Sequence, residues 1–340
     1  MNLPAFQEWL CRSFAVAGIA AFCVVLCPAG WRVRVRQAVP VVAFAVLIAL
    51  SAGFLLPLPS MEMRAPSSLA RLAETAGGWF APWVKWVFAS GVVLFLARLI
   101  AGCLAVRGLV RRSRPVRGRS WRVLLAGCQE AIGLRGAVQV RLAGTGFVPS
   151  ATGLFRRTVL LPDEALRWTH EERRLVLLHE LGHFRRGDLW THALGQIACA
   201  VHWFNPFVWM LHRHLAIERE FACDALVVSR GAMPTDYATL LWRMGVAASG
   251  PRLAAAAFLA MAARGEGTLE RRVRRILAPA NHSGFWLRAA DSTLCAGGTM
   301  LVLLFASFKP VIFRTMLGVN PWTVQEIEAR LAADPFPGEK

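Results

Sequence analysis

The chain has 340 residues, 56% of them hydrophobic, and its mean hydropathy of +0.45 is too high for an ordinary soluble domain. Its formal net charge is +18, and almost all of the positive charge comes from arginine. Such a charge occurs in nucleic-acid-binding proteins, but it also marks the cytoplasmic loops of membrane proteins. Because no aromatic-basic recognition motif stands out, we expect no direct nucleic-acid partner.

Four apolar stretches reach the length of a transmembrane helix, which needs about 20 mostly apolar residues. They lie at about 10–29, 38–58, 83–106 and 291–313. Tryptophans at the start of the third stretch are typical of a membrane interface. The sequence therefore predicts a three-span membrane region over residues 1–110 and a fourth transmembrane helix within 287–313.

Arginine-rich segments predict how the chain lies across the membrane. They follow the first span at 32–36 and the third span at 107–122, whereas the loop 59–82 is nearly neutral. The positive-inside rule then places residues 111–286 in the cytoplasm. The N-terminus and the short C-terminal tail 314–340 are expected on the outer side of the membrane.

The cytoplasmic segment 111–286 is long enough to be a domain. Short β-prone runs separated by glycine, proline and serine predict two or three strands over 137–162. From Glu164 onward the pattern is helical. The expected fold class is a mainly α membrane protein with four transmembrane helices and an α+β domain inserted between spans three and four.

The stretch HELGH places two histidines and a glutamate within one predicted helix. Residues four apart share a helix face, so His179 and His183 can both reach one metal ion. Glu180 lies about 100° further round, near a metal-bound water. This H-E-x-x-H pattern is typical of zinc metallopeptidases, in which the glutamate is the general base. We therefore predict a Zn²⁺ site with Glu180 as the catalytic residue.

A second helical stretch offers the third ligand that a catalytic zinc site needs. Glu220 and Asp224 are one turn apart, so Glu220 can bind zinc while Asp224 accepts the outer N–H of a ligand histidine. Glu218 is the rival ligand, but it has no acidic residue four positions later. Two histidines and a glutamate are a known catalytic zinc set.

The apolar segment 189–210 cannot cross the membrane once, since it would separate His179 and His183 from Glu220. It must return to the same side as a buried or surface-lying helix. Asp188 is expected to cap a helix or form a salt bridge. An oxyanion donor stays unassigned. His202, His212 and His214 are candidates, but histidines at such positions more often lie on the surface or serve in packing.

Three segments resemble the membrane metallopeptidase domain of the BlaR/MecR antirepressor family. They are ERRLVLLHELGHFRRGDLW, HWFNPFVWMLHRHLAIEREFACDALVV and TLERRVRRIL, and the resemblance covers roughly 120–280. It implies a gluzincin-like zinc domain in a bacterial cytoplasmic (inner) membrane. It also implies a protein substrate, either a cytoplasmic transcriptional repressor or the chain itself. Family members that sense β-lactams carry a penicillin-binding domain after the last span. Because residues 314–340 hold no S-x-x-K, S-D-N or K-T-G set, we expect no acylation here and a separate membrane sensor as partner.

Two other functions are consistent with the same residues. One is a general membrane quality-control or CAAX-type zinc endopeptidase, which shares both motifs. The other is a non-catalytic membrane signalling receptor with a structural zinc, although such a site has no need of the base Glu180. No organic cofactor is expected. Cleavage of a regulatory protein by a membrane-bound zinc endopeptidase is the function that the sequence favours.

Overall fold

The computed structural model describes residues 3–26, 33–52, 61–63, 81–248, 266–278 and 308–310. These residues are mainly helical and include one four-stranded mixed sheet. The expectation of a mainly α protein that also contains a small β-sheet is therefore confirmed.

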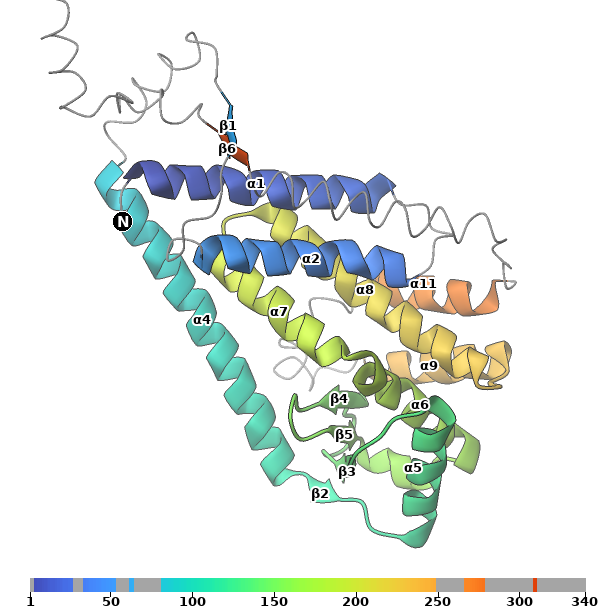
Figure 1. The fold of residues 1–340 in the computed structure, drawn as a ribbon. Coiled ribbons are helices and arrows are strands. Elements are labelled where there is room, and N and C mark those ends of the chain that lie inside the picture. The colour runs from blue at the N-terminus through green and yellow to red at the C-terminus, as the bar shows by residue number, and fades with distance from the viewer. Residues whose placement is uncertain are drawn as a thin grey trace, which may run out of the picture.

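Three long apolar helices form the N-terminal part of the fold (Figure 1). They are α1 (Leu3–Leu26), α2 (Val33–Ala52) and α4 (Ala81–Arg112). In α4, the stretch Trp86–Arg112 is long and apolar enough to cross a membrane. Its large apolar side chains are either exposed or only partly buried, as expected for a surface that faces lipid.

The expectation of four full-length spans is confirmed only for the third. Within α1 and α2 the apolar stretches are shorter, at Arg12–Val25 and Gln37–Ser51. The charge of Arg12 bounds the first stretch, and residues 53–58 of the second expected span lie outside the described residues. Most of the fourth expected span lies outside the described residues. Its residues 308–310 form strand β6 (Phe308–Pro310), which pairs with β1 (Met61–Met63) instead of continuing a helix.

The apolar segment that could not cross the membrane once forms a helical hairpin. Helix α7 (Asp188–Val201) and helix α8 (Pro206–Ser229) pack on each other and on α2 (Figure 1). Helix α8 begins where it does because the Asn205 side chain accepts a hydrogen bond from the backbone N–H of Phe207, with Pro206 at the first helical position. The chain thus returns toward α6, so that Glu220 lies on the same side as His179 and His183, as the sequence analysis predicted.

The sheet contains the short strands predicted over 137–162. Their order is β2-β3-β5-β4, formed by Arg114–Pro115, Gln139–Leu142, Thr158–Leu161 and Ser150–Thr152 respectively. The β3–β5 pair is parallel and the other two pairs are antiparallel. Strand β5 is buried at every position. Helices α5 (Arg119–Ile132) and α6 (His170–Arg186) pack together beside this sheet.

Helix α8 belongs to two apolar cores. Leu211 and Leu215, in its first half, pack in a core with α1 and α2. Val227, in its second half, packs in a core with α5, α6 and the sheet. The second core also includes α9 (Pro234–Ala248) and α11 (Glu266–Leu277). One rigid helix therefore connects the membrane-type bundle to the α+β part.

Candidate metal centre

Helix α6 carries the H-E-x-x-H residues, and its ends are fixed by local sequence signals. The Thr169 hydroxyl accepts from the backbone N–H of Glu172 at 3.2 Å, and the Glu172 carboxylate accepts from the backbone N–H of Thr169 at 2.8 Å. This capping box satisfies two N–H groups at the start of the helix. The helix ends at Gly187, whose φ of 72° lies in the left-handed region that favours glycine.

A close crossing of α6 and α8 occurs at Gly182. A Cβ atom at this position would lie 3.0 Å from a methyl carbon of Leu226 and 3.2 Å from Sγ of Cys223. A larger residue would require the Leu226 or Cys223 side chain to move, because protein interiors are close-packed. The small residue between the two histidines thus allows α8 to approach the metal-binding face of α6.

The crossing brings His179, His183 and Glu220 together. Nε2 of His179 lies 3.6 Å from Oε2 of Glu220, and Nε2 of His183 lies 3.8 Å from Oε1 of the same carboxylate. One ligand atom from each of the three residues falls within 4.8 Å of the others. In the part of the chain that the structure describes, Glu220 and not Glu218 is the carboxylate grouped with these histidines.

The outer nitrogen of His179 faces Asp224 and Tyr237. Nδ1 of His179 lies 3.2 Å from Oδ1 of Asp224 and 2.9 Å from the Tyr237 hydroxyl, which donates to the same Asp224 oxygen at 2.8 Å. Acceptors at Nδ1 hold the proton there and leave Nε2 free to bind a metal. The sequence singled out Asp224 but not Tyr237, although Tyr237 is the one tyrosine in the chain.

The outer nitrogen of His183 faces Asp188, just beyond the end of α6. Nδ1 of His183 lies 3.0 Å from Oδ2 of Asp188, which also accepts from Nε of Arg186 at 3.2 Å. Asp188 therefore forms the salt bridge that we expected, and it also orients a metal-site histidine. The sequence signal for this contact was the position of Asp188, five residues after His183 and at the break between two helices.

The same neighbourhood holds a second group of metal-type side chains, His183, Asp188 and Cys223. Zinc binds the thiolate form of cysteine. Burial and the nearby Asp188 raise the pKa of the Cys223 thiol well above its ordinary value. In addition, Asp188 lies against Nδ1 of His183, where a carboxylate orients a histidine that binds metal through its other nitrogen. The group of two histidines and Glu220 is therefore the better metal site.

A cation from α11 lies behind the site. Arg272 contacts Oε2 of Glu220 at 2.8 Å and makes two hydrogen bonds to Asp224, at 2.7 and 2.8 Å. The stretch LERRVRRIL is strongly basic, but this arginine faces the protein interior and not the solvent. The side chains of Glu220 and Asp224 are 22% and 4% exposed, and that of Arg272 is 13% exposed.

These contacts determine the charge state of the site. Burial raises the pKa of Glu220, but Arg272, with His179 and His183, lowers it well below its ordinary value. Burial acts in the same direction on Asp224, yet Arg272 and His179 bring its pKa down to about 2. Burial lowers the pKa of His179, whereas its contacts with Asp224 and Glu220 raise it to about 9. Both carboxylates are thus ionised at neutral pH.

The donor set fits a zinc ion. Two imidazoles and a carboxylate are ligands that Zn²⁺ prefers, and three protein ligands leave a fourth position for water or substrate. Both outer histidine nitrogens face carboxylates, as is usual for zinc-binding histidines. Glu180 is buried beside His179 on α6 and contributes no ligand atom to the group described here.

The three histidines considered as oxyanion donors differ in position. His202 is fully buried, and its two ring nitrogens contact the hydroxyls of Ser13 at 2.7 Å and Ser51 at 3.1 Å. It therefore holds the hairpin turn against α1 and α2. His212 is buried beside the ring of His192, at a centroid distance of 5.3 Å. His214, on the same helix as His212, is half-buried.

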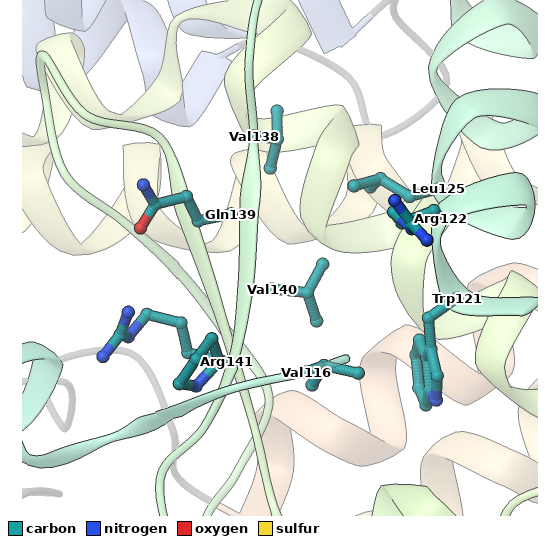
Figure 2. A pocket seen from close by; sticks show the side chains of 9 residues that line it. Val116, Trp121, Arg122, Leu125, Val138, Gln139, Val140 and Arg141 are labelled. Carbon is teal, nitrogen blue, oxygen red and sulfur yellow. The ribbon is translucent and has the colours of Figure 1, made fainter. Parts of the chain in front are cut away.

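A separate pocket lies away from the metal centre, between strands β2 and β3 and helix α5. Figure 2 shows Trp121 and Leu125 of α5 across from Val140 of β3 and from Val138, which directly precedes that strand. The pocket has a volume of about 290 Å³, and its lining contains none of the metal-site residues. The chemistry of the histidine–glutamate group therefore does not use it.

A helix with H-E-x-x-H and a glutamate from a crossing helix is the arrangement of a metallopeptidase. The chain belongs to the BlaR1 peptidase M56 family, because the sequence model of that family matches residues 63–276. It is also 27% identical, over 161 residues, to the regulatory protein BlaR1 of Bacillus licheniformis. That match covers 47% of this chain but only 26% of the relative. The resemblance to the antirepressor family is thus confirmed.

Proposed function

We propose that this protein is an integral-membrane zinc endopeptidase whose active site is formed by α6 and α8. The observation that carries the proposal is the meeting of His179, His183 and Glu220, with Asp224 and Asp188 at the outer histidine nitrogens. A structural zinc site, which is usually closed by four protein ligands, would need no acidic residue next to its first histidine.

The residues around the site would act in different ways. His179, His183 and Glu220 would hold the zinc ion, which supplies a Lewis acid for the scissile carbonyl and lowers the pKa of water. Glu180 would accept the proton of the attacking water and pass it to the leaving amine. Asp224 and Asp188 would keep the two imidazoles in the tautomer that binds the metal through Nε2.

The proposed organisation keeps the domain boundaries derived from the sequence. Residues 1–110 would form the membrane region, 111–286 the cytoplasmic peptidase domain and 314–340 an external tail. A last transmembrane helix would lie within 287–313 and would end before strand β6 at 308–310. The apolar length of α4 and the arginines at its C-terminal end support this orientation. Reporters fused after Arg119 and after Val319 test it. The first should report the cytoplasm and the second the outer side, and an external reading at Arg119 contradicts the orientation.

The proposed substrate is a regulatory protein, either a cytoplasmic transcriptional repressor or the chain itself. The support is membership of the BlaR1 peptidase family and the similarity to a Bacillus relative that is a regulatory protein by name. A general quality-control peptidase would instead cleave many unrelated membrane or cytoplasmic proteins. Comparing cleaved proteins in cells that express the parent or an inactive variant distinguishes one regulatory substrate from many.

Replacing Glu180 by glutamine tests the proposed activity. The Glu180→Gln protein should bind zinc like the parent but should lose proteolysis, because the amide cannot accept a proton. Glu171→Gln is the matched control, since Glu171 lies on the same helix but is exposed and paired with Arg174. A Glu180→Gln protein that cleaves as fast as the parent would show that Glu180 is not the base.

A further inference from the structure

Arg272 is an arginine on the apolar face of its helix. In α11 the positions 269, 272, 273 and 276 share one face, because they recur with helical spacing. Val273 and Ile276 pack into the core of the α+β part. Arg274, on another face, is exposed and paired with Glu270 one turn away. Burial on the apolar face is costly for a charge unless it is compensated, and the two carboxylates of the metal centre provide that compensation.

The guanidinium of Arg272 uses three of its nitrogens on two carboxylates. Its Nε and one terminal nitrogen donate to the two oxygens of Asp224, at 2.8 and 2.7 Å. The other terminal nitrogen lies 2.8 Å from Oε2 of Glu220. A planar fork of donors can hold two carboxylates at a fixed relative position, which a lysine ammonium cannot do.

The two carboxylates do different work at the proposed zinc site. Glu220 would be a ligand, while Asp224 orients the ligand His179 from its outer nitrogen. Without a cation between them, two partly buried negative charges one helical turn apart would repel each other. Each side chain could then turn toward solvent and away from the histidines. Tyr237 donates a hydrogen bond to Asp224 at 2.8 Å, but its hydroxyl is neutral. Within the described part of the chain it makes no hydrogen bond to Glu220, so it cannot hold the two carboxylates together.

We infer that Arg272 is a positioning residue of the metal centre, which preassembles Glu220 as a zinc ligand and Asp224 as the partner of His179. This inference rests on the proposed zinc site and extends it to a third helix. It assigns to the basic stretch of α11 a role inside the enzyme, in addition to any contact of its exposed arginines with lipid.

Zinc affinity of the full-length protein in detergent, measured by competition with a chelator, tests this assignment. We expect Arg272→Ala to bind zinc about 10–100-fold more weakly than the parent, as is typical when a partner of a metal ligand is lost. Arg274→Ala is the matched control on the same helix and should bind zinc like the parent. Arg272→Lys should keep part of the affinity, because it restores charge but not the fork.

Guanidinium ion added to Arg272→Ala provides a measurement that loss of packing alone would not affect. It should restore most of the zinc affinity, whereas methylammonium at the same concentration should restore less. Substitution with Co²⁺ gives a second measurement, since the visible spectrum of the ion changes when Glu220 is displaced. If Arg272→Ala does not fold, Arg272→Lys is compared with the parent instead. Its Co²⁺ spectrum is expected to differ from that of the parent.

Three outcomes separate the inference from the proposed function. A parent protein that binds zinc and cleaves its substrate, with an Arg272→Ala variant of equal zinc affinity, overturns the inference alone. An Arg272→Lys variant with the affinity and Co²⁺ spectrum of the parent contradicts the requirement for the fork. A parent protein that binds no zinc overturns the proposed function itself.

Discussion

Nδ1 of His183 lies 3.0 Å from Oδ2 of Asp188, across the helix break at Gly187. Asp188 should therefore act on zinc through His183. We expect Asp188→Asn to weaken zinc binding by about 10–100-fold, because an amide can present its donor to the imidazole and favour the wrong tautomer. Chelator competition measures the effect. Asp236→Asn is the control, since Asp236 is exposed on α9, and equal affinities of the two variants would contradict the assignment.

Glu220 and Glu218 can be compared directly, because they are two residues apart on α8. Glu220→Gln should lose most of its bound zinc, since an amide oxygen is a poorer ligand than a carboxylate. Glu218→Gln should retain it, because the structure does not group Glu218 with the histidines. Metal analysis of the two purified proteins measures the difference. The reverse pattern would mean that the third ligand is Glu218.

The turn between α7 and α8 should contribute strongly to stability. The buried Asn205 caps α8 through Phe207 and donates to the backbone oxygen and hydroxyl of Ser13 on α1. Asn205→Ala removes these bonds and should lower the free energy of unfolding by about 1–3 kcal/mol. Ser229→Ala, at the exposed other end of α8, is the control. Thermal unfolding in detergent compares the two variants. Equal melting temperatures would contradict a contribution of the Asn205 hydrogen bonds to stability.

The capping box of α6 predicts a pH dependence. The backbone N–H of Thr169, together with Arg243, lowers the pKa of Glu172 below its ordinary value of 4.5. The carboxylate therefore stabilises the fold above pH 4.5, and this contribution is lost as the pH falls through the lower value of the folded state. Glu172→Gln should be less stable than the parent at pH 7, and the difference should shrink below pH 4.5. A difference that stays constant with pH would contradict a role for the carboxylate charge.

The sequence predicts contacts within one helix better than contacts between helices. The pairs His179–His183 and Glu220–Asp224 are one turn apart, so helical spacing indicates which side chains share a face. The preference for Glu220 over Glu218 came from the same spacing, and the structure groups Glu220 with the histidines. Their roles at a metal ion stay predictions.

The outer contacts of the site depend on how four helices cross, which spacing along one helix cannot predict. Tyr237 on α9 and Arg272 on α11 reach Asp224 from two other helices, 13 and 48 residues further along the chain. Arg272 did have a signal, because it interrupts the apolar face of an otherwise amphipathic helix. Asp188 was expected to form a salt bridge, and its second contact, with His183, follows from the tight break at Gly187.

Hydropathy identified the positions of the three N-terminal helices, but within the described residues the apolar stretches of α1 and α2, at Arg12–Val25 and Gln37–Ser51, are shorter than the spans it predicted. It also predicted a helix at 308–310, where pairing with β1 gives a strand. The tertiary partner of that strand is more than 240 residues away in sequence, from Met61 to Phe308, and no local pattern indicates it.

X-ray absorption at the zinc edge of the purified full-length protein tests the central claim most directly. The account predicts a first shell of nitrogen and oxygen only, at about 2.0–2.2 Å, with scattering from two imidazoles. The Glu220→Gln protein should lose this ordered shell, while the Cys223→Ser protein should retain it. A sulfur at about 2.3 Å that disappears in Cys223→Ser would place the metal at His183, Asp188 and Cys223 instead, and would contradict the account.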